Sequence, residues 1–181
     1  MKPSAPSAQA KPSPAARGVL LQMRAIGVIR SPWTVARGTP VQPTFAEGAR
    51  GQVIVDPVYA EALADIEGFE RLWLIYWLDR AAAYRPVVTP YLDDRPHGAF
   101  ATRSPARPNP IGLSAVRLVE RRGCTLEVAD LDVLDSTPLL DVKPYVPRFD
   151  AWTGRAGWLD EAPCETTRDD GRFGRAPGTE A

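Results

Sequence analysis

The 181-residue sequence predicts a mainly β protein: a compact antiparallel β-barrel with one short helix and long rim loops. Many short apolar runs have strand character, and turn residues separate them about every eight to twelve residues. A doubly wound fold needs strands that alternate with longer helices, and only one short helix is indicated. No GxGxxG follows the first strand, so a Rossmann-type nucleotide site is not supported.

Strand-like runs recur along most of the chain. The run at 72–78, LWLIYWL, is expected to be fully buried because it is apolar throughout. Ser114–Glu120 alternates and is expected to pair with Thr125–Ala129 across the turn at Arg122-Gly123. The predicted strands are 23–30, 51–55, 72–78, 87–88, 99–102, 114–120, 125–129 and 131–134.

One helix is predicted after the strand at 51–55. Asp56-Pro57 is typical of a helix start, with an N-cap residue followed by proline at the first helical position. Tyr59, Leu63 and Ile66 recur at helical spacing, and Gly68 ends the pattern. The segment 31–50 that precedes this strand carries three prolines and two glycines, which predict a long loop or a set of turns.

Composition divides the chain into three parts. Residues 1–18 are rich in Pro, Ala, Ser and Lys and are expected to form a disordered tail. Residues 19–160 form the predicted barrel domain, and 161–181 a loosely ordered extension anchored by Trp158 or Phe173. With no apolar stretch near the ~20 residues that span a bilayer, the chain is expected to be cytoplasmic, with no membrane partner.

Charge and metal-ligand content exclude several classes of function. The chain has 22 basic and 22 acidic residues, yet Arg95–Arg122 holds six arginines and one glutamate, a local net charge of +5. Such a segment can attract phosphate, or it can form a solvated face. With one histidine, His97, and no CxxC, we expect no metal site and no Ser-His-Asp triad. Cys124 and Cys164 are expected to be reduced thiols.

Four polar or proline-fixed segments lie where strands are expected to end: 38–42, 79–80, 100–114, and 135–138 continuing into 141–145. Rim loops of a small barrel are where ligand-binding groups usually gather. Tryptophans 33, 73 and 77 could stack on bases, although core packing is the commoner role of a tryptophan in a buried strand.

The loop from Phe100 to Ser114 is rigid by composition. Its three prolines, at 105, 108 and 110, restrict their own φ angles and the residues before them, so little freedom remains to be lost on binding. Arg103 and Arg107 offer planar donor forks for carboxylate or phosphate, and Asn109 can donate and accept together. The alternative is a structural corner whose arginines form salt bridges with Asp135 or Asp141.

Four motifs in order carry a family resemblance: AIGVIRSP, IEGFERLWLIYW, GAFATRSPARPNPIGLSAVRL and DVLDSTPLLDVKPYVPRFD. Over about residues 24–150 the chain resembles the TsaA-like (YaeB, TrmO-type) S-adenosylmethionine-dependent tRNA methyltransferases. The resemblance implies a TsaA-like β-barrel and a homodimer whose cofactor site lies near the interface. It also implies transfer of a methyl group to the exocyclic nitrogen of threonylcarbamoyladenosine at position 37 of tRNA.

The resemblance also implies residue roles. A weak base suffices for the implied transfer, and the candidates are Asp79, Asp141 and water. Asp135 is expected to hold the amino or ribose groups of the cofactor, and Arg103 or Arg107 the threonyl carboxylate or a phosphate. Substrate-binding candidates are Arg107, Asn109, Lys143 and Tyr145. The implied cofactor-binding residues are Pro40, Val41, Gln42, Asp79, Arg80, Arg103, Leu113, Asp135, Ser136, Thr137 and Pro138.

The chain departs from the family pattern at a few of these places. Arg71 and Asp79 stand where the family usually has histidine, Val41 where it usually has arginine, and Ser136 where glycine is common. These departures leave open two alternatives: a barrel that binds S-adenosylmethionine and has lost catalysis, and a methyltransferase for another small acceptor.

Overall fold

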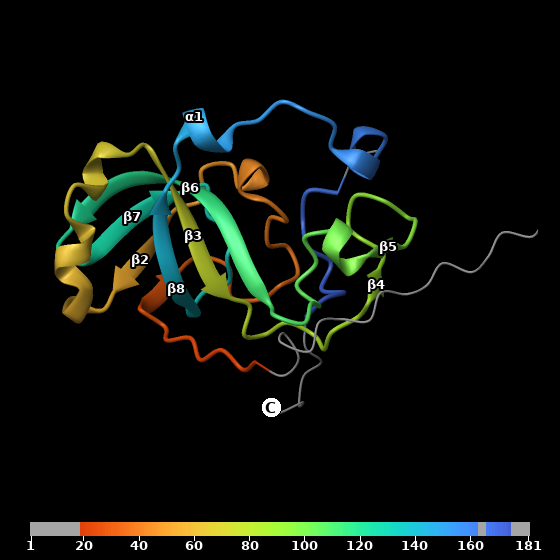
Figure 1. Ribbon diagram of the computed structural model, residues 1–181, viewed down its shortest axis with the longest axis horizontal. Coiled ribbons are helices and arrows are strands. Elements are labelled where there is room, and N and C mark those ends of the chain that lie inside the picture. Colours follow the sequence, from red (N-terminus) through yellow and green to blue (C-terminus); the bar gives the residue numbers. More distant parts are fainter. Residues whose placement is uncertain (1–18, 163–165, 175–181) are drawn as a thin grey trace, which may run out of the picture.

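A computed structural model describes residues 19–162 and 166–174. A closed barrel fills one end of the molecule, and a smaller lobe built around a two-stranded sheet lies at the other end (Figure 1). The tail predicted at 1–18, part of the predicted C-terminal extension and Cys164 lie outside the described residues.

Six antiparallel strands close the barrel in the order β1-β2-β7-β6-β3-β8. Closure pairs every barrel strand on both sides and removes exposed edges. The predicted fold class is therefore confirmed. The strands are β1 Gly27–Arg30, β2 Gly51–Val55, β3 Arg71–Trp77, β6 Ile111–Arg122, β7 Thr125–Ala129 and β8 Thr137–Pro144.

The core fills the barrel interior with alternate residues of each strand. In β3, Leu72, Leu74 and Tyr76 are buried, whereas Trp73 is only partly buried and Trp77 is half exposed. The prediction of a fully buried strand at 72–78 was wrong because β3 has one face inside the barrel and one outside. The largest fully buried side chains include Ile29, Leu72, Leu74, Leu126, Leu131 and Leu139.

The helix predicted after β2 is present as two short 3-10 helices, η3 Pro57–Leu63 and η4 Ile66–Gly68. The Asp56 carboxylate accepts a 3.1 Å hydrogen bond from the Val58 N–H, as an N-cap should. Asp65, with a φ of 63°, interrupts the helical backbone between them. The other short helices are η2 Pro43–Phe45, η5 Ala99–Ala101, α1 Pro147–Asp150 and η6 Gly157–Asp160.

Two predicted strands were wrong. Residues 99–101 form η5, and residues 131–134 lie outside any strand. The last barrel strand is instead β8, which begins at Thr137, inside a segment predicted to be polar loops. Asp130 and Ser136 both have φ near +64°, and these two left-handed residues bound the irregular segment. Pro138 and Pro144 concealed β8 because proline usually argues against a central strand.

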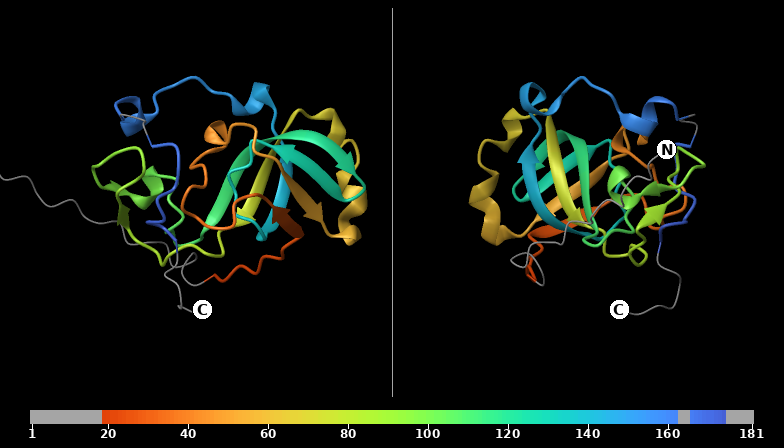
Figure 2. Two further views of the ribbon diagram at one scale, coloured as in Figure 1. Left: turned by 180° about the vertical axis from the view of Figure 1, so that it is seen from behind. Right: turned by 45° about the vertical axis from the view of Figure 1, so that its right-hand side comes forward.

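The lobe consists of β4 Val87–Val88, β5 His97–Gly98 and η5, and residues 166–174 run beside it (Figures 1 and 2). Phe173 is buried against Val88, Ala106 and Tyr91. The backbone of this segment also pairs with Pro40 and Ala81. The segment therefore joins the lobe to the loops above the barrel. Within the described ranges, no helix is long and apolar enough to cross a membrane.

Candidate active site

A cavity of about 950 Å³ opens between the barrel and the lobe. Its floor comes from β3, β6 and the irregular segment before β8, and its rim from the 39–45 loop, the 100–109 loop and the segment that ends at Gly174. Cavities of this size and mixed polarity are typical small-molecule sites. Of the predicted cofactor-binding residues, the cavity is lined by Pro40, Val41, Gln42, Asp79, Arg80, Arg103, Leu113 and Thr137.

The loop before β6 is held by its own side chains. Arg107 donates from Nη1 to the carbonyl oxygens of Thr102 (3.0 Å) and Ser104 (3.2 Å), and its guanidinium lies 5.8 Å from the centre of the Phe100 ring. The Thr102 hydroxyl accepts from the Ser104 N–H at 3.2 Å. Arg107 therefore fixes the loop from within, although it also lines the cavity.

Arg103 extends across the rim from this loop, and its Nη1 donates to Oε1 of Gln42 in the opposite loop. Among the described residues, no carboxylate lies within salt-bridge distance of Arg103 or Arg107. Asp135 pairs instead with Arg30, and Asp141 with Lys143. The alternative of a salt-bridged structural corner is therefore wrong for these arginines. An exposed guanidinium paired with a neutral amide keeps most of its donors available for an anionic ligand group.

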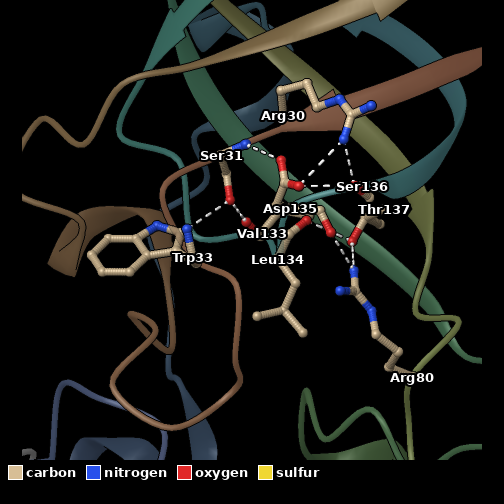
Figure 3. Close-up of polar contacts among 9 residues, drawn as sticks. All are labelled: Arg30, Ser31, Trp33, Arg80, Val133, Leu134, Asp135, Ser136 and Thr137. Carbon is tan, nitrogen blue, oxygen red and sulfur yellow. Dashed lines mark hydrogen bonds and ion pairs between the residues drawn. The ribbon is translucent and has the colours of Figure 1, made fainter.

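Arg80 links the end of β3 to the start of β8. Its Nη2 donates to the Asp135 carbonyl oxygen and to Thr137 Oγ1, each at 2.8 Å, as Figure 3 shows. Asp79 lies beside it, with Oδ1 3.4 Å from Arg80 Nε. This arrangement places one carboxylate and one guanidinium in the same cavity wall.

The Asp135 carboxylate braces a turn and does not line the cavity. Its Oδ1 accepts from the Ser31 N–H at 3.0 Å, and its Oδ2 from Arg30 and Ser136, on the side of the turn opposite Arg80 (Figure 3). The Ser31 N–H and the Ser136 hydroxyl, together with Arg30, hold the pKa of Asp135 below its ordinary value. Ser136 and Pro138 are likewise absent from the cavity lining, whereas Thr137 faces it.

The remaining predicted residues divide between two hollows. Asn109 lines the main cavity with Arg107. The centre of the Tyr145 ring lies 5.3 Å from that of Trp73, and Tyr145 lines a neighbouring hollow of about 540 Å³. The two hollows share Gln42, Thr44, Trp73, Arg103 and Leu113. Lys143 and Asp141 form a 2.8 Å ion pair outside both hollows.

A chain of polar side chains in the cavity floor was missed from the sequence. The Ser114 hydroxyl donates to Asp132 Oδ1 at 2.6 Å and lies 2.9 Å from the Tyr76 hydroxyl. Burial raises the pKa of Asp132 to about 6. Asp132 lies between Leu131 and Val133, both buried, and a lone acid between two core residues was the available signal.

The described residues hold no group of three His, Cys, Asp or Glu side chains placed to bind a metal ion. The polar groups around the cavity are instead guanidinium, amide, hydroxyl and carboxyl groups. Such groups suit hydrogen bonding to an organic ligand with amino, carboxylate and hydroxyl groups.

Comparison with known proteins places the chain in one family. Residues 28–151 match the family described as the tRNA-methyltransferase O N-terminal domain. The chain is 49% identical over 158 residues to a probable S-adenosyl-L-methionine-binding protein of Pyrococcus abyssi, covering 86% of each chain. It is 38% identical over 136 residues to the tRNA (adenine(37)-N6)-methyltransferase of Escherichia coli, covering 70% of this chain and 58% of that one.

The fold is similar to the crystal structure of TrmO from Pseudomonas aeruginosa, with a TM-score of 0.65 and 36% sequence identity. The match covers 77% of this chain but 62% of the solved chain, so this protein spans less than two thirds of that structure. The matched region, 28–151, includes every barrel strand except the first residue of β1 and most of the cavity wall. The chain therefore belongs to the tRNA-methyltransferase O N-terminal domain family.

Proposed function

We propose that this protein transfers a methyl group from S-adenosylmethionine to the exocyclic nitrogen of threonylcarbamoyladenosine at position 37 of tRNA. The observation that carries the proposal is the cavity itself, in which residues from four separate loops of the family-matched region converge. The barrel thus performs methyl transfer without a Rossmann-type nucleotide site.

The cavity suits S-adenosylmethionine in both size and chemistry. Aromatic and aliphatic side chains from the barrel offer apolar surface, while Gln42, Asp79 and Arg80 offer donors and acceptors to amino, carboxylate and ribose groups. When bound, S-adenosylmethionine supplies the methyl group from a positively charged sulfonium. Pro40 and Leu113 border the same space, and the backbone beside them can frame the adenine ring.

The protein's main task in such a transfer is alignment. An in-line displacement gains roughly 7–11 kcal/mol when donor and acceptor are held in the reactive geometry. Arg107 and the three prolines fix the shape of the 100–110 loop, so Arg103 is positioned before either reactant arrives. Its guanidinium then serves to hold the carboxylate of the threonyl group, or a tRNA phosphate, at the cavity rim.

The acceptor approaches beside the second hollow in this proposal. Trp73 borders both hollows, and its ring, together with that of Tyr145, offers a surface on which a nucleobase can stack. The shared residues Gln42 and Arg103 stand at the junction of the two spaces.

Two measurements test the proposal. Calorimetry with S-adenosylmethionine should give saturable binding, and nucleoside mass spectrometry should find the methylated threonylcarbamoyladenosine missing from tRNA of a strain lacking the gene and restored by its return. Binding without any change in tRNA would favour a barrel that has lost catalysis or methylates another small acceptor. Absence of binding would contradict the proposal outright.

We further propose a cytoplasmic homodimer. Trp77 (50% exposed) pairs across β3 and β6 with Ile111 (42%), and Leu113 (53%) and Phe100 (76%) extend this apolar surface to the cavity rim. Exposed apolar surface of this kind is typical of a subunit interface. Light scattering at micromolar concentration with cofactor should give twice the chain mass. Trp77→Ser should shift the protein to monomer, whereas Val58→Ser, on η3, should not.

A further inference from the structure

The predicted site roles leave two carboxylates of the described cavity wall without a use: Asp132, and Asp169, which accepts a hydrogen bond from the Gly171 N–H in its own turn. Asp132 comes from the irregular segment before β8 and lies in the cavity floor. Its Oδ1 accepts the 2.6 Å hydrogen bond from Ser114 in β6, and Ser114 in turn meets Tyr76 of β3 at 2.9 Å. Three separate elements thus converge on one carboxyl group.

The direction of this hydrogen-bond chain follows from the chemistry of its members. An ionised carboxylate only accepts, so the single Ser114 proton must be donated to Asp132. The Ser114 oxygen is then available as the acceptor for the Tyr76 hydroxyl. Burial, more than any other influence, raises the pKa of Tyr76 and keeps this phenol protonated. Tyr76 and Ser114 therefore orient the carboxylate without competing for its charge.

The surroundings make Asp132 a stronger base than an ordinary carboxylate. Burial raises its pKa to about 6, against the opposing effects of the Ser114 hydrogen bond and the positive charge of Arg103. The other titratable or charged groups in the described cavity wall are Tyr76, Asp79, Arg80, Tyr91, Arg107 and Asp169. An asparagine would accept the Ser114 proton equally well without the cost of a buried charge, so a packing role does not explain the carboxylate.

Methyl transfer to the nitrogen of threonylcarbamoyladenosine requires a proton acceptor. This nitrogen carries one hydrogen, and it lies between a purine and a carbonyl group, so the hydrogen is more acidic than that of an ordinary exocyclic amine. A base with a pKa near neutrality suits this task. The earlier candidates are less well placed, because Asp79 is next to the Arg80 guanidinium and Asp141 is paired with Lys143 outside the cavity.

We propose that Asp132 is the catalytic residue that accepts the proton from the acceptor nitrogen, and that Ser114 and Tyr76 are positioning residues for its carboxylate. This inference rests on the proposed methyltransferase function. In the step, the nitrogen's electron pair forms the bond to the methyl carbon, and the carbon–sulfur bond pair stays on sulfur as a neutral thioether. The N–H proton passes to Asp132, which then releases it to water.

The first test compares the full-length protein with Asp132→Asn. Single-turnover methylation of tRNA carrying threonylcarbamoyladenosine should rise with pH in the wild type, with an inflection near pH 6, and then level off. The variant should lose the inflection and about 10²- to 10⁴-fold in rate. If the wild type methylates tRNA and Asp132→Asn keeps the same rate and the same inflection, the assignment of Asp132 fails while the proposed function stands. A wild type that methylates no tRNA would overturn the proposed function and this inference together.

Calorimetry separates proton transfer from cofactor binding. Asp132→Asn should bind S-adenosylmethionine and its neutral product S-adenosylhomocysteine within about twofold of the wild type, since a proton acceptor need not contact either. A selective loss of affinity for S-adenosylmethionine would mean that the carboxylate stabilises the sulfonium, and the proposal would fail.

Ser114→Ala provides a second variant that keeps the carboxylate. The Ser114 hydrogen bond lowers the pKa of Asp132, so its removal should move the inflection to higher pH. The rate above the inflection should also fall, because the carboxylate loses the donor that orients it. Tyr76→Phe should move the inflection in the same direction by a smaller amount. It removes the hydroxyl that polarises Ser114, so the Ser114 hydrogen bond to Asp132 is weakened but kept. An unchanged plateau with an unmoved inflection would contradict the positioning role.

Discussion

Arg103 and Gln42 meet across the rim of the cavity, joining the loop before β6 to the loop before η2 through a hydrogen bond from the guanidinium to the amide oxygen. The two residues are 61 positions apart in the chain. The contact is exposed, so it contributes little to stability. Its value lies in holding two cavity-lining side chains in one place.

Arg103→Ala should lower single-turnover methylation roughly ten- to a hundredfold while changing the melting temperature little. Loss of a charge-assisted hydrogen bond to the bound complex costs on the order of 1.5–3 kcal/mol. Arg117→Ala is the matched control, because that arginine lies on β6 and itself lines neither hollow, although it pairs with Asp130. A drop of several degrees in melting temperature with normal turnover per folded molecule would assign Arg103 a structural role instead.

Arg80→Met should affect both stability and cofactor affinity. The substitution keeps a long apolar side chain but leaves the Asp135 carbonyl and the Thr137 hydroxyl without their 2.8 Å donor. Loss of a partner for partly buried acceptors costs about 1–3 kcal/mol. Thermal unfolding and calorimetry should both show the loss. Arg30→Met is the control, because it removes the exposed ion-pair partner of Asp135 in the same turn and should change stability and cofactor affinity little. Equal effects of the two variants would refute a special role for Arg80.

Local sequence pattern predicted most of the barrel strands because alternation and turn residues report directly on one buried face. It located β2 and β7 at their observed bounds. It failed at β8, where the two prolines hid a strand whose neighbours, β1 and β3, are distant in sequence. Such pairing depends on barrel closure, which cannot be recognised from a short stretch of sequence.

The candidate site was likewise predicted only in part from the sequence. Loops fixed by proline and arginine marked the rim, and Gln42, Arg80 and Arg103 line the cavity. Asp135 is conspicuous in sequence, yet its carboxylate is used by Ser31 and Arg30. Asp132, three residues earlier, enters the cavity because the left-handed backbone at Asp130 ends β7 and redirects the chain. Only the folded backbone distinguishes these two acids.

Gly112→Ala should disturb the cavity floor. Gly112 lies opposite Tyr76 in the β3–β6 ladder, and an added methyl group would sit 2.1 Å from the Tyr76 ring. The ring is buried and cannot move without displacing its hydroxyl from Ser114. We expect a loss of about 1–3 kcal/mol in unfolding free energy, as for other overpacked sites. Gly98→Ala, with open space around it, is the control; a Gly112→Ala protein as stable as that control would contradict the predicted clash.

The last prediction concerns stability and pH at Asp132. Burial raises the pKa of this carboxyl group from 3.8 to about 6, so the folded protein binds its proton more tightly than the unfolded chain does. The protonated group contributes its full stability below about pH 4, and that contribution is lost as pH rises through about 6. At neutral pH the ionised side chain therefore costs the folded state on the order of 1–3 kcal/mol.

Asp132→Asn should remove this cost, because asparagine is neutral at every pH and its oxygen can still accept from Ser114. Urea unfolding should find the variant as stable as wild type near pH 4 and more stable than wild type above about pH 6. Asp141→Asn is the control, since that carboxylate lies outside the cavity beside Lys143 and should give no such gain. A variant with constant or reduced relative stability across this range would mean that Asp132 is not penalised by burial. A gain in stability combined with the loss of turnover expected of a proton acceptor would show that the carboxylate is maintained for function at the expense of the fold.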